Sequence, residues 1–187
     1  MVTSIAKLLR FNVGDLTKKI SLDIEFEHML LYLKILKERY EDLEFDIQVD
    51  ENVLRQFETV RLVLQPIVEN AFKHGYEKHK TNSKYIGISG RLEEQAYVLT
   101  IKDASKGMDV GIMHKLNDLF AQTTVNQIVL EDRTNDGKGT GLWNVHSRMR
   151  LMFGEPYGLN IRKSNSEGTE IEISFPRRDI DVQSADS

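Results

Sequence analysis

One predicted helix carries polar side chains whose types suit a metal-bound polyphosphate. The segment 62–77 has an apolar side, and helical spacing places on its other side Asn70, Lys73, His74 and Glu77. An amide oxygen can ligate a hard cation, an ammonium can pair with phosphate, and an imidazole can pack against a base. Spacing alone, however, favours a solvent-facing stripe in which a Glu69–Lys73 ion pair contributes little.

A second group of residues directly follows a predicted strand. This segment runs from Asp103 to Met108 and includes Gly107. An aspartate at the end of a strand can accept a hydrogen bond from an adenine amino group, and a glycine lets the backbone approach a ligand closely. By itself the segment fits an ordinary turn better.

A third feature is a cluster of glycines that opens a predicted helix. Gly137, Gly139 and Gly141 flank Thr140 at the start of the helical segment 140–153. Free N–H groups at a helix N-terminus can bind an anion, and glycines let phosphates reach them. The spacing matches neither a Walker A loop nor a dinucleotide fingerprint, and a flexible loop before a capped helix is the alternative.

The elements that position these residues follow from the periodicity of the apolar side chains. Helices are predicted over residues 3–13, 22–40, 62–77, 112–120 and 140–153, and strands over 44–49, 84–91, 96–102, 159–163 and 169–175. The segment 121–138 is the most loop-like part of the chain, and the tail 177–187 is polar. Strands and helices in this order indicate an α+β fold, with one mixed sheet and helices packed on one face.

Composition narrows the class of function. The 187 residues suit one domain, or one domain with a helical extension. A net charge of -4 argues against nucleic acid as the main ligand, and the absence of cysteine excludes disulfides and thiolate metal sites. No stretch approaches the ~20 apolar residues that span a bilayer, and the N-terminus lacks the apolar run of a signal peptide. We therefore expect a soluble cytoplasmic domain, with any membrane anchor outside this sequence.

The order of the three features resembles the GHKL ATPase superfamily, which includes gyrase, MutL and histidine kinases. QPIVENAFKHG at 65–75 resembles the N box of LytS/YesM-type sensor histidine kinases, and GTGLWNVHSRM at 139–149 resembles their G2 box. FGEPYGL at 153–159 and GTEI at 168–171 resemble the C-terminal segments of that family. Residues 4–11 and 32–40 resemble its upstream helices, so the resemblance covers nearly the whole chain.

The resemblance implies a Bergerat-type α/β sandwich with a mostly antiparallel sheet. It divides the chain into a helical segment at 1–41, which would be the end of a dimerisation region, a catalytic domain at 42–177 and a polar tail at 178–187. The implied cofactors are ATP and Mg²⁺. The implied partners are the phosphoacceptor-histidine segment of the same kinase, a cognate response regulator and, in the intact membrane-anchored protein, a second copy of the kinase.

Individual roles carry over by the same resemblance. Asn70 would coordinate Mg²⁺, Lys73 would contact phosphate, and His74 would lie against adenine. Asp103 would read the adenine amine, and Glu69 would be a proton acceptor or an outer-shell metal partner. The remaining nucleotide contacts, with 121–138 as a lid, would come from Gly107, Met108, Gly137, Gly139, Thr140, Gly141, Leu142 and Thr169.

Two departures from the family pattern bear on function. The G1 box usually reads Asp-Asn-Gly-x-Gly, whereas Ala104 and Ser105 stand where asparagine and glycine are expected, and the turn would be strained if Ser105 needed a positive φ. The phosphoacceptor motif, a histidine followed closely by Phe-x-Phe-Asn, is also missing; Arg10-Phe11-Asn12 has no such histidine. We therefore expect no autophosphorylation by this chain alone. The histidines outside the N box are expected to be surface or packing residues; these are His28, His79, His114 and His146.

Three functions remain open at this stage. The first is a kinase module that transfers phosphate from Mg-ATP to a histidine outside the chain and from there to a response regulator. The second is a degenerate GHKL module that binds nucleotide weakly or not at all and regulates a partner by contact, which the altered G1 turn supports. The third is an ATP-driven clamp like MutL, against which the LytS/YesM-like boxes argue.

Overall fold

A five-stranded mixed sheet forms the centre of the structure, a computed structural model that describes residues 2–73, 84–123 and 141–178. The strands lie in the order β2-β4-β5-β7-β6, with β2 parallel to β4 and every other neighbouring pair antiparallel. Their bounds are β2 Leu43–Gln48, β4 Lys84–Leu92, β5 Ala96–Asp103, β6 Gly158–Asn165 and β7 Gly168–Pro176. The predicted α+β class with a mixed, mostly antiparallel sheet is confirmed.

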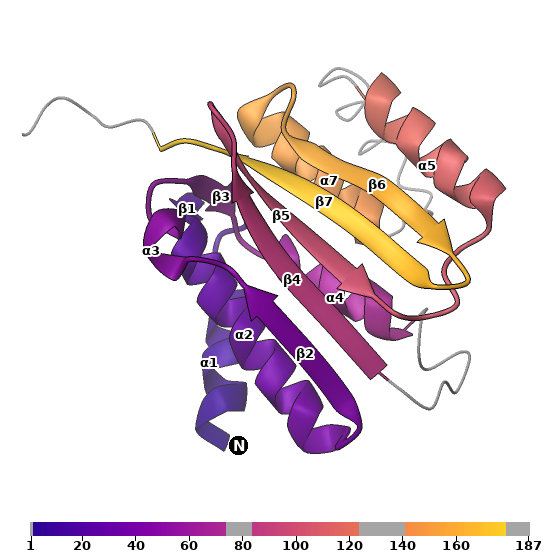
Figure 1. Cartoon of the computed structure of the whole chain (residues 1–187). Coiled ribbons are helices and arrows are strands. Elements are labelled where there is room, and N and C mark those ends of the chain that lie inside the picture. The colour runs from indigo at the N-terminus through magenta and orange to yellow at the C-terminus, as the bar shows by residue number, and fades with distance from the viewer. Residues whose placement is uncertain (1, 74–83, 124–140, 179–187) are drawn as a thin grey trace, which may run out of the picture.

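Helices cover one face of this sheet. Figure 1 shows α2 (Leu22–Arg39), α4 (Leu64–Asn70) and α7 (Gly141–Phe153) behind the strands, with α5 (Val110–Gln122) beside β6. Alternate strand residues point toward these helices and are fully or almost fully buried, among them Ile86, Ile88, Ile171 and Ile173. This period of two explains why the strands could be predicted from the sequence.

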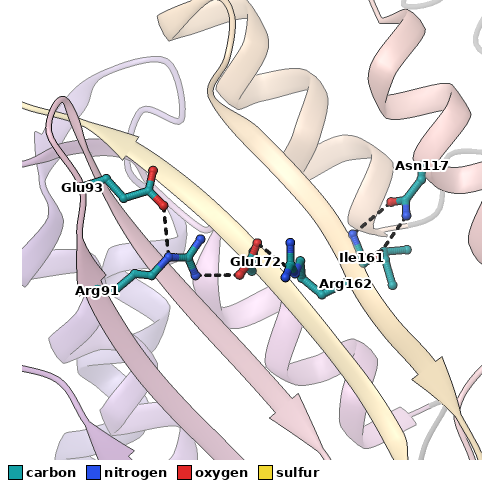
Figure 2. Close-up of polar contacts among 6 residues, drawn as sticks. All are labelled: Arg91, Glu93, Asn117, Ile161, Arg162 and Glu172. Atoms are coloured by element: carbon teal, nitrogen blue, oxygen red, sulfur yellow. Dashed lines mark hydrogen bonds and ion pairs between the residues drawn. The ribbon is translucent and has the colours of Figure 1, made fainter.

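The other face of the sheet carries charged side chains (Figure 2). The guanidinium of Arg91 lies 2.6 Å from one carboxylate oxygen of Glu172, and Arg162 lies 3.7 Å from the other. Arg91 also contacts Glu93, at 3.0 Å. The side chains of Arg91, Glu93 and Arg162 are about half exposed, whereas that of Glu172 is 13% exposed. Ion pairs that involve exposed side chains contribute roughly 0–1 kcal/mol each, so these pairs add little to stability.

The N-terminal part of the chain packs against the same core. Helix α1 (Val2–Asn12) precedes β1 (Lys19–Ser21), which pairs antiparallel with β3 (Glu58–Val60). The apolar side of α2 joins the buried cluster formed by the sheet through Leu22, Phe26, Met29 and Leu33. Strands β1 and β3 and helix α3 (Glu51–Leu54) were not predicted, because three or four residues are too few to show a period. The division of the chain at residue 41 stays a prediction.

The free edge of β6 is covered by a side chain of α5. The Asn117 amide donates to the carbonyl of Ile161 at 2.8 Å and accepts from its N–H at 3.0 Å, as Figure 2 shows. Asn117 thus occupies the position that a further strand would take, next to the irregularity between Ile161 and Lys163. This pair of bonds attaches α5 to the sheet.

Two predicted helices have different ends in the structure. Helix α4 begins at Leu64, two residues after the predicted start at residue 62, and continues into a π-helical turn over 71–73. Residues 74–77 of the predicted helix lie outside the described part of the chain. Helix α5 begins at Val110, where residue 112 was predicted, because Asp109 caps it by accepting from the N–H groups of Gly111 and Ile112. Among the helices that the structure describes, none is long and apolar enough to cross a membrane.

Candidate functional site

Asp103 ends β5 as a buried carboxylate that the main chain holds in place. Its side chain is 5% exposed, and Oδ1 accepts from the N–H of Ser105 at 2.9 Å and from the N–H of Thr169 at 3.2 Å. Burial raises the pKa of Asp103, while these two bonds and the Ser105 hydroxyl act in the opposite direction. Both backbone bonds end on Oδ1, so Oδ2 receives neither of these N–H groups.

The turn after Asp103 rests on the hairpin between β6 and β7. Gly107 has φ +71°, and a Cβ there would lie 2.2 Å from the carbonyl oxygen of Asn165. The N–H of Met108 donates to Ser164 Oγ at 2.8 Å, and Ser164 Oγ lies 3.0 Å from Thr169 Oγ1. The structure therefore brings together Asp103, Gly107, Met108 and Thr169, four of the residues predicted for the site.

Ser105 does not strain this turn. Among the described residues, Leu62 is the only one other than glycine with a positive φ, so the left-handed conformation expected to need a glycine at position 105 is not present. Ser105 is 3% exposed, and its hydroxyl accepts from the N–H of Gly107 at 3.3 Å. Serine at this position thus supplies a hydrogen bond inside the turn, and the glycine that the geometry requires is Gly107.

Helix α4 carries the second group of predicted residues. Asn70 is its last residue and is half-buried. One residue earlier, the Glu69 carboxylate accepts from Gln65 Nε2 at 2.6 Å and lies 3.6 Å from the Nζ of Lys73. The Lys73 side chain is 65% exposed, so its ammonium is accessible to a ligand despite this pair. His74 lies outside the described residues.

The third group lies at the start of α7. Gly141 is the first helical residue that the structure describes, and no atom of the described chain lies within 4 Å of where its Cβ would be. Packing within the described part of the chain therefore does not require glycine at this position. The side chain of Leu142 is 2% exposed and belongs to the core, which anchors the first turn of the helix. Gly137, Gly139 and Thr140 lie outside the described residues.

These segments gather at one end of the sheet. Figure 1 shows the end of β5, the turn between β6 and β7, the C-terminal end of α4 and the N-terminal end of α7 on the same side of the molecule. Hydrogen bonds connect the first two, and α4 packs against α7 behind the strands. Asp103, Asn70 and Lys73 are thus carried by elements that meet at the same end of the sheet.

Sequence reasoning missed Ser164 and the contribution of Ser105. Ser164 lies between the predicted strands 159–163 and 169–175, and its hydroxyl connects Met108 to Thr169. No local pattern signals such a role, because the residues that Ser164 joins are 56 residues before it and five after it. Two of the histidines outside the N box are packing residues, as expected: His28 stacks on Phe11 and His146 stacks on Phe120.

Comparisons with known proteins find relatives over nearly the whole chain. YesM of Bacillus subtilis, a sensor histidine kinase, is 30% identical over 179 residues, which are 95% of this chain and 27% of the relative. The sensor histidine kinase BtsS of Escherichia coli is 28% identical over 96% of this chain, and the sensor protein LytS of Streptococcus agalactiae is 26% identical over 88%. The chain spans about a quarter of the length of these relatives.

Solved structures show the same fold. A histidine kinase domain from Erythrobacter litoralis superposes with a TM-score of 0.53 at 13% identity, covering 94% of this chain and 74% of that one. The mycobacterial sensor histidine kinase MprB gives a TM-score of 0.50 at 16% identity, covering 86% and 97%. The family described as histidine kinase-, DNA gyrase B- and HSP90-like ATPase matches residues 56–179. The chain therefore belongs to this ATPase family and is homologous to sensor histidine kinases of the YesM, BtsS and LytS type.

Proposed function

We propose that this chain is the ATP-binding catalytic part of a sensor histidine kinase. It would donate the γ-phosphate of Mg-ATP to a histidine outside the chain, for relay to a response regulator. The observation that carries the proposal is the buried Asp103, fixed by the N–H groups of Ser105 and Thr169 beside the glycine turn at Gly107. Homology to sensor kinases over 95% of the chain supports the same reading.

The residues present fit adenine. Asp103 is held on Oδ1 by two backbone N–H groups, an arrangement that orients the carboxylate, and Oδ2, which receives neither of them, would accept from an exocyclic amine. The raised pKa of Asp103, caused by burial, reflects a low-dielectric site in which one additional donor to the carboxylate would bind strongly. Met108 is part of the same turn and is fixed through Ser164, so it can lie beside the base.

The residues present also fit a Mg²⁺ ion beside the phosphates. Mg²⁺ at nucleotide sites is held by one or two protein oxygen ligands together with phosphate oxygens and water. Among residues 2–73, 84–123 and 141–178, no group of three or more acidic or histidine side chains forms a metal cage. As the resemblance of the N box implies, Asn70, at the end of α4, would be the protein ligand, and Glu69 would orient it from one residue away.

The work of the protein would be positioning and charge neutralisation. Bound Mg-ATP supplies the phosphoryl group, and Lys73 would contact its phosphates from the turn after α4. Gly141 and Leu142, at the start of α7, would supply backbone N–H groups, together with the residues just before them. Glu69 would take up a proton or hold the metal hydration shell. The phosphoacceptor histidine, a response regulator and a second kinase subunit would be the partners.

Calorimetric titration with a non-hydrolysable ATP analogue, with and without Mg²⁺, tests the proposal. We expect saturable, Mg-dependent binding at micromolar strength, which corresponds to ~8 kcal/mol. Incubation with ATP alone should leave the chain unphosphorylated. A second chain that carries the phosphoacceptor segment of a related kinase should become phosphorylated when it is added. Absence of binding at millimolar nucleotide would contradict the proposal and favour the regulatory module that acts by contact.

A further inference from the structure

The turn between β3 and α4 is held by a carboxylate from another helix. Glu25 of α2 is fully buried and accepts three backbone N–H groups, from Leu62 at 2.9 Å, Val63 at 2.8 Å and Leu64 at 3.0 Å. Leu62 has φ +58°, a left-handed conformation that is unfavourable for a branched side chain. Contacts from outside the turn must therefore stabilise it, and Glu25 supplies the largest set of them.

Helix α7 contacts the carbonyl groups of the same turn. The guanidinium of Arg148 donates to the carbonyl of Arg61 at 2.9 Å and to the carbonyl of Leu62. Its own charge favours ionised Glu25, and burial of the pair opposes ionisation of both. The N–H side of the turn thus belongs to α2 and the carbonyl side to α7.

The side chain of Arg61 extends this contact to α1. Its guanidinium lies over the ring of Phe11 at 4.7 Å and donates to the Phe11 carbonyl at 3.3 Å. The same guanidinium occupies the space beside Gly14. Three helices besides α4 therefore contact this turn in the described part of the chain: α1 and α2 from the N-terminal segment, and α7.

Stability alone is a poor reason for this arrangement. Local caps such as serine or aspartate satisfy helix N-termini with little desolvation, as Asp109 does for α5. A buried carboxylate and guanidinium lose hydration that their interactions only partly restore, and apolar pairs of similar size are often at least as stable. Buried polar groups do, however, select one geometry, because any other pose leaves them without partners. The geometry selected here is that of α4 relative to α2 and α7.

We propose that Glu25 and Arg148 are positioning residues, which hold the turn 61–63 and thereby set how α4 presents Asn70 to the nucleotide. Helix α4 has seven residues, so its start and its end are less than two full turns apart. A change in the direction of its first residues therefore moves Asn70 and Glu69 as well. The nucleotide part of this proposal rests on the proposed function, whereas the orientation of α4 can be observed without a ligand.

The test combines two measurements on the full chain. The first is the NMR spectrum without nucleotide, in which Glu25→Gln and Arg148→Lys should shift the backbone amide signals of Glu69 and Asn70 as well as those of Leu62 to Leu64. The second is calorimetry with the Mg-bound ATP analogue, in which Glu25→Ala should weaken binding at least tenfold. Glu25→Gln keeps an oxygen that can accept from the N–H groups and should recover part of this loss.

A matched control separates positioning from stability. Leu43 is fully buried in β2, and Leu43→Ala should lower the melting temperature without moving the Asn70 signal or changing the nucleotide affinity more than twofold. Shifts confined to Leu62–Leu64 in Glu25→Gln, with unchanged affinity, would overturn the inference and leave Glu25 a local cap. If the wild-type chain binds no nucleotide, the proposed function fails, and the Asn70 signal alone then decides whether Glu25 positions α4. Glu25→Gln and Arg148→Lys also keep the test decisive if Glu25→Ala does not fold.

Discussion

The Asp103 carboxylate accepts a hydrogen bond from the backbone N–H of Thr169 at 3.2 Å, across 66 residues of sequence. This contact joins the end of β5 to the start of β7, the neighbouring strand in the sheet. Gly168 also shows how closely the two strands approach, because a Cβ on Gly168 would lie 1.9 Å from the carbonyl oxygen of Asp103. The proposed adenine-binding residue is therefore oriented by the sheet and does not depend on its own turn alone.

Asp103→Asn should weaken nucleotide binding while leaving the fold largely intact. The amide oxygen of asparagine can still accept from Ser105 and Thr169, but its nitrogen cannot accept from the adenine amine. Loss of a hydrogen bond to a charged group corresponds to about 1.5–3 kcal/mol, or roughly tenfold to a hundredfold in the dissociation constant. Calorimetry measures the affinity, and thermal unfolding measures the stability. Asp50→Asn, at the cap of α3, is the matched control and should bind normally. Unchanged affinity in Asp103→Asn would remove the adenine assignment.

Asn70→Ala should abolish the Mg²⁺ dependence of nucleotide binding. The substitution removes the one oxygen ligand that the chain is proposed to offer, so Mg²⁺ can no longer connect the protein to the phosphates. Titrations with and without Mg²⁺ should then give dissociation constants that agree within about a factor of two. This is less than the tenfold change in the dissociation constant that about 1.4 kcal/mol produces. Asn52→Ala, on the exposed surface of α3, should keep the wild-type dependence. A persistent dependence in Asn70→Ala would place the metal ligand elsewhere.

Gly107→Ala should destabilise the protein. Its φ of +71° is unfavourable for alanine, and the new Cβ would lie 2.2 Å from the Asn165 carbonyl oxygen, so the turn must move away from the β6–β7 hairpin. We expect a loss of about 2–4 kcal/mol in the free energy of unfolding by urea denaturation. Gly141→Ala meets no atom of the described chain and lies in a helix, so it should not lower stability. Equal stability of the two variants would contradict the close approach at Gly107.

His146 should make the protein less stable as the pH falls. Burial, together with the charge of Arg150, lowers the pKa of His146 from 6.5 to about 4, and its Nδ1 accepts from the N–H of Leu159 at 3.0 Å. A lowered pKa means that the unfolded chain takes up the proton first, so this stability is complete above pH 6.5 and is lost as the pH falls toward 4. The effect is roughly 3 kcal/mol at most.

The measurement for His146 is the free energy of unfolding at several pH values. Burial raises the pKa of Glu25 to about 7, so its contribution declines as the pH rises and opposes that of His146. The difference between wild type and His146→Gln removes the shared contribution of Glu25. That difference should shrink between pH 6.5 and pH 4, and a constant difference would show that His146 is not held in its neutral form.

Asn117→Ala should loosen α5 from the edge of the sheet. The N–H and carbonyl of Ile161 would lose both partners, at a cost of about 1–2 kcal/mol in the free energy of unfolding. Amide hydrogen exchange should become faster at Ile161 and along α5, while β4 and β5 keep their protection. Asn160→Ala, one residue away on β6 and exposed, should change neither quantity. Unchanged exchange in Asn117→Ala would mean that apolar packing alone holds α5.

The sequence determined the residue types of the site and the long elements that carry them. Alternating polar and apolar residues indicated β2, and the N box and G2 box residues indicated the family that the comparisons confirm. These signals are local: each is complete within a segment of about ten residues, so a period or a motif can be recognised without knowing the fold.

Tertiary structure alone decided which distant groups support that site. Ser164 connects Met108 with Thr169, and Glu25 holds the turn before α4 from 37 to 39 residues away. Ser105 fits the G1 turn because its φ is not positive, which the residue type could not show. Hydrogen-bond partners of a buried polar group depend on where the chain returns in space, and no local pattern encodes that return. Side-chain chemistry was therefore readable from the sequence, whereas its orientation was set by packing.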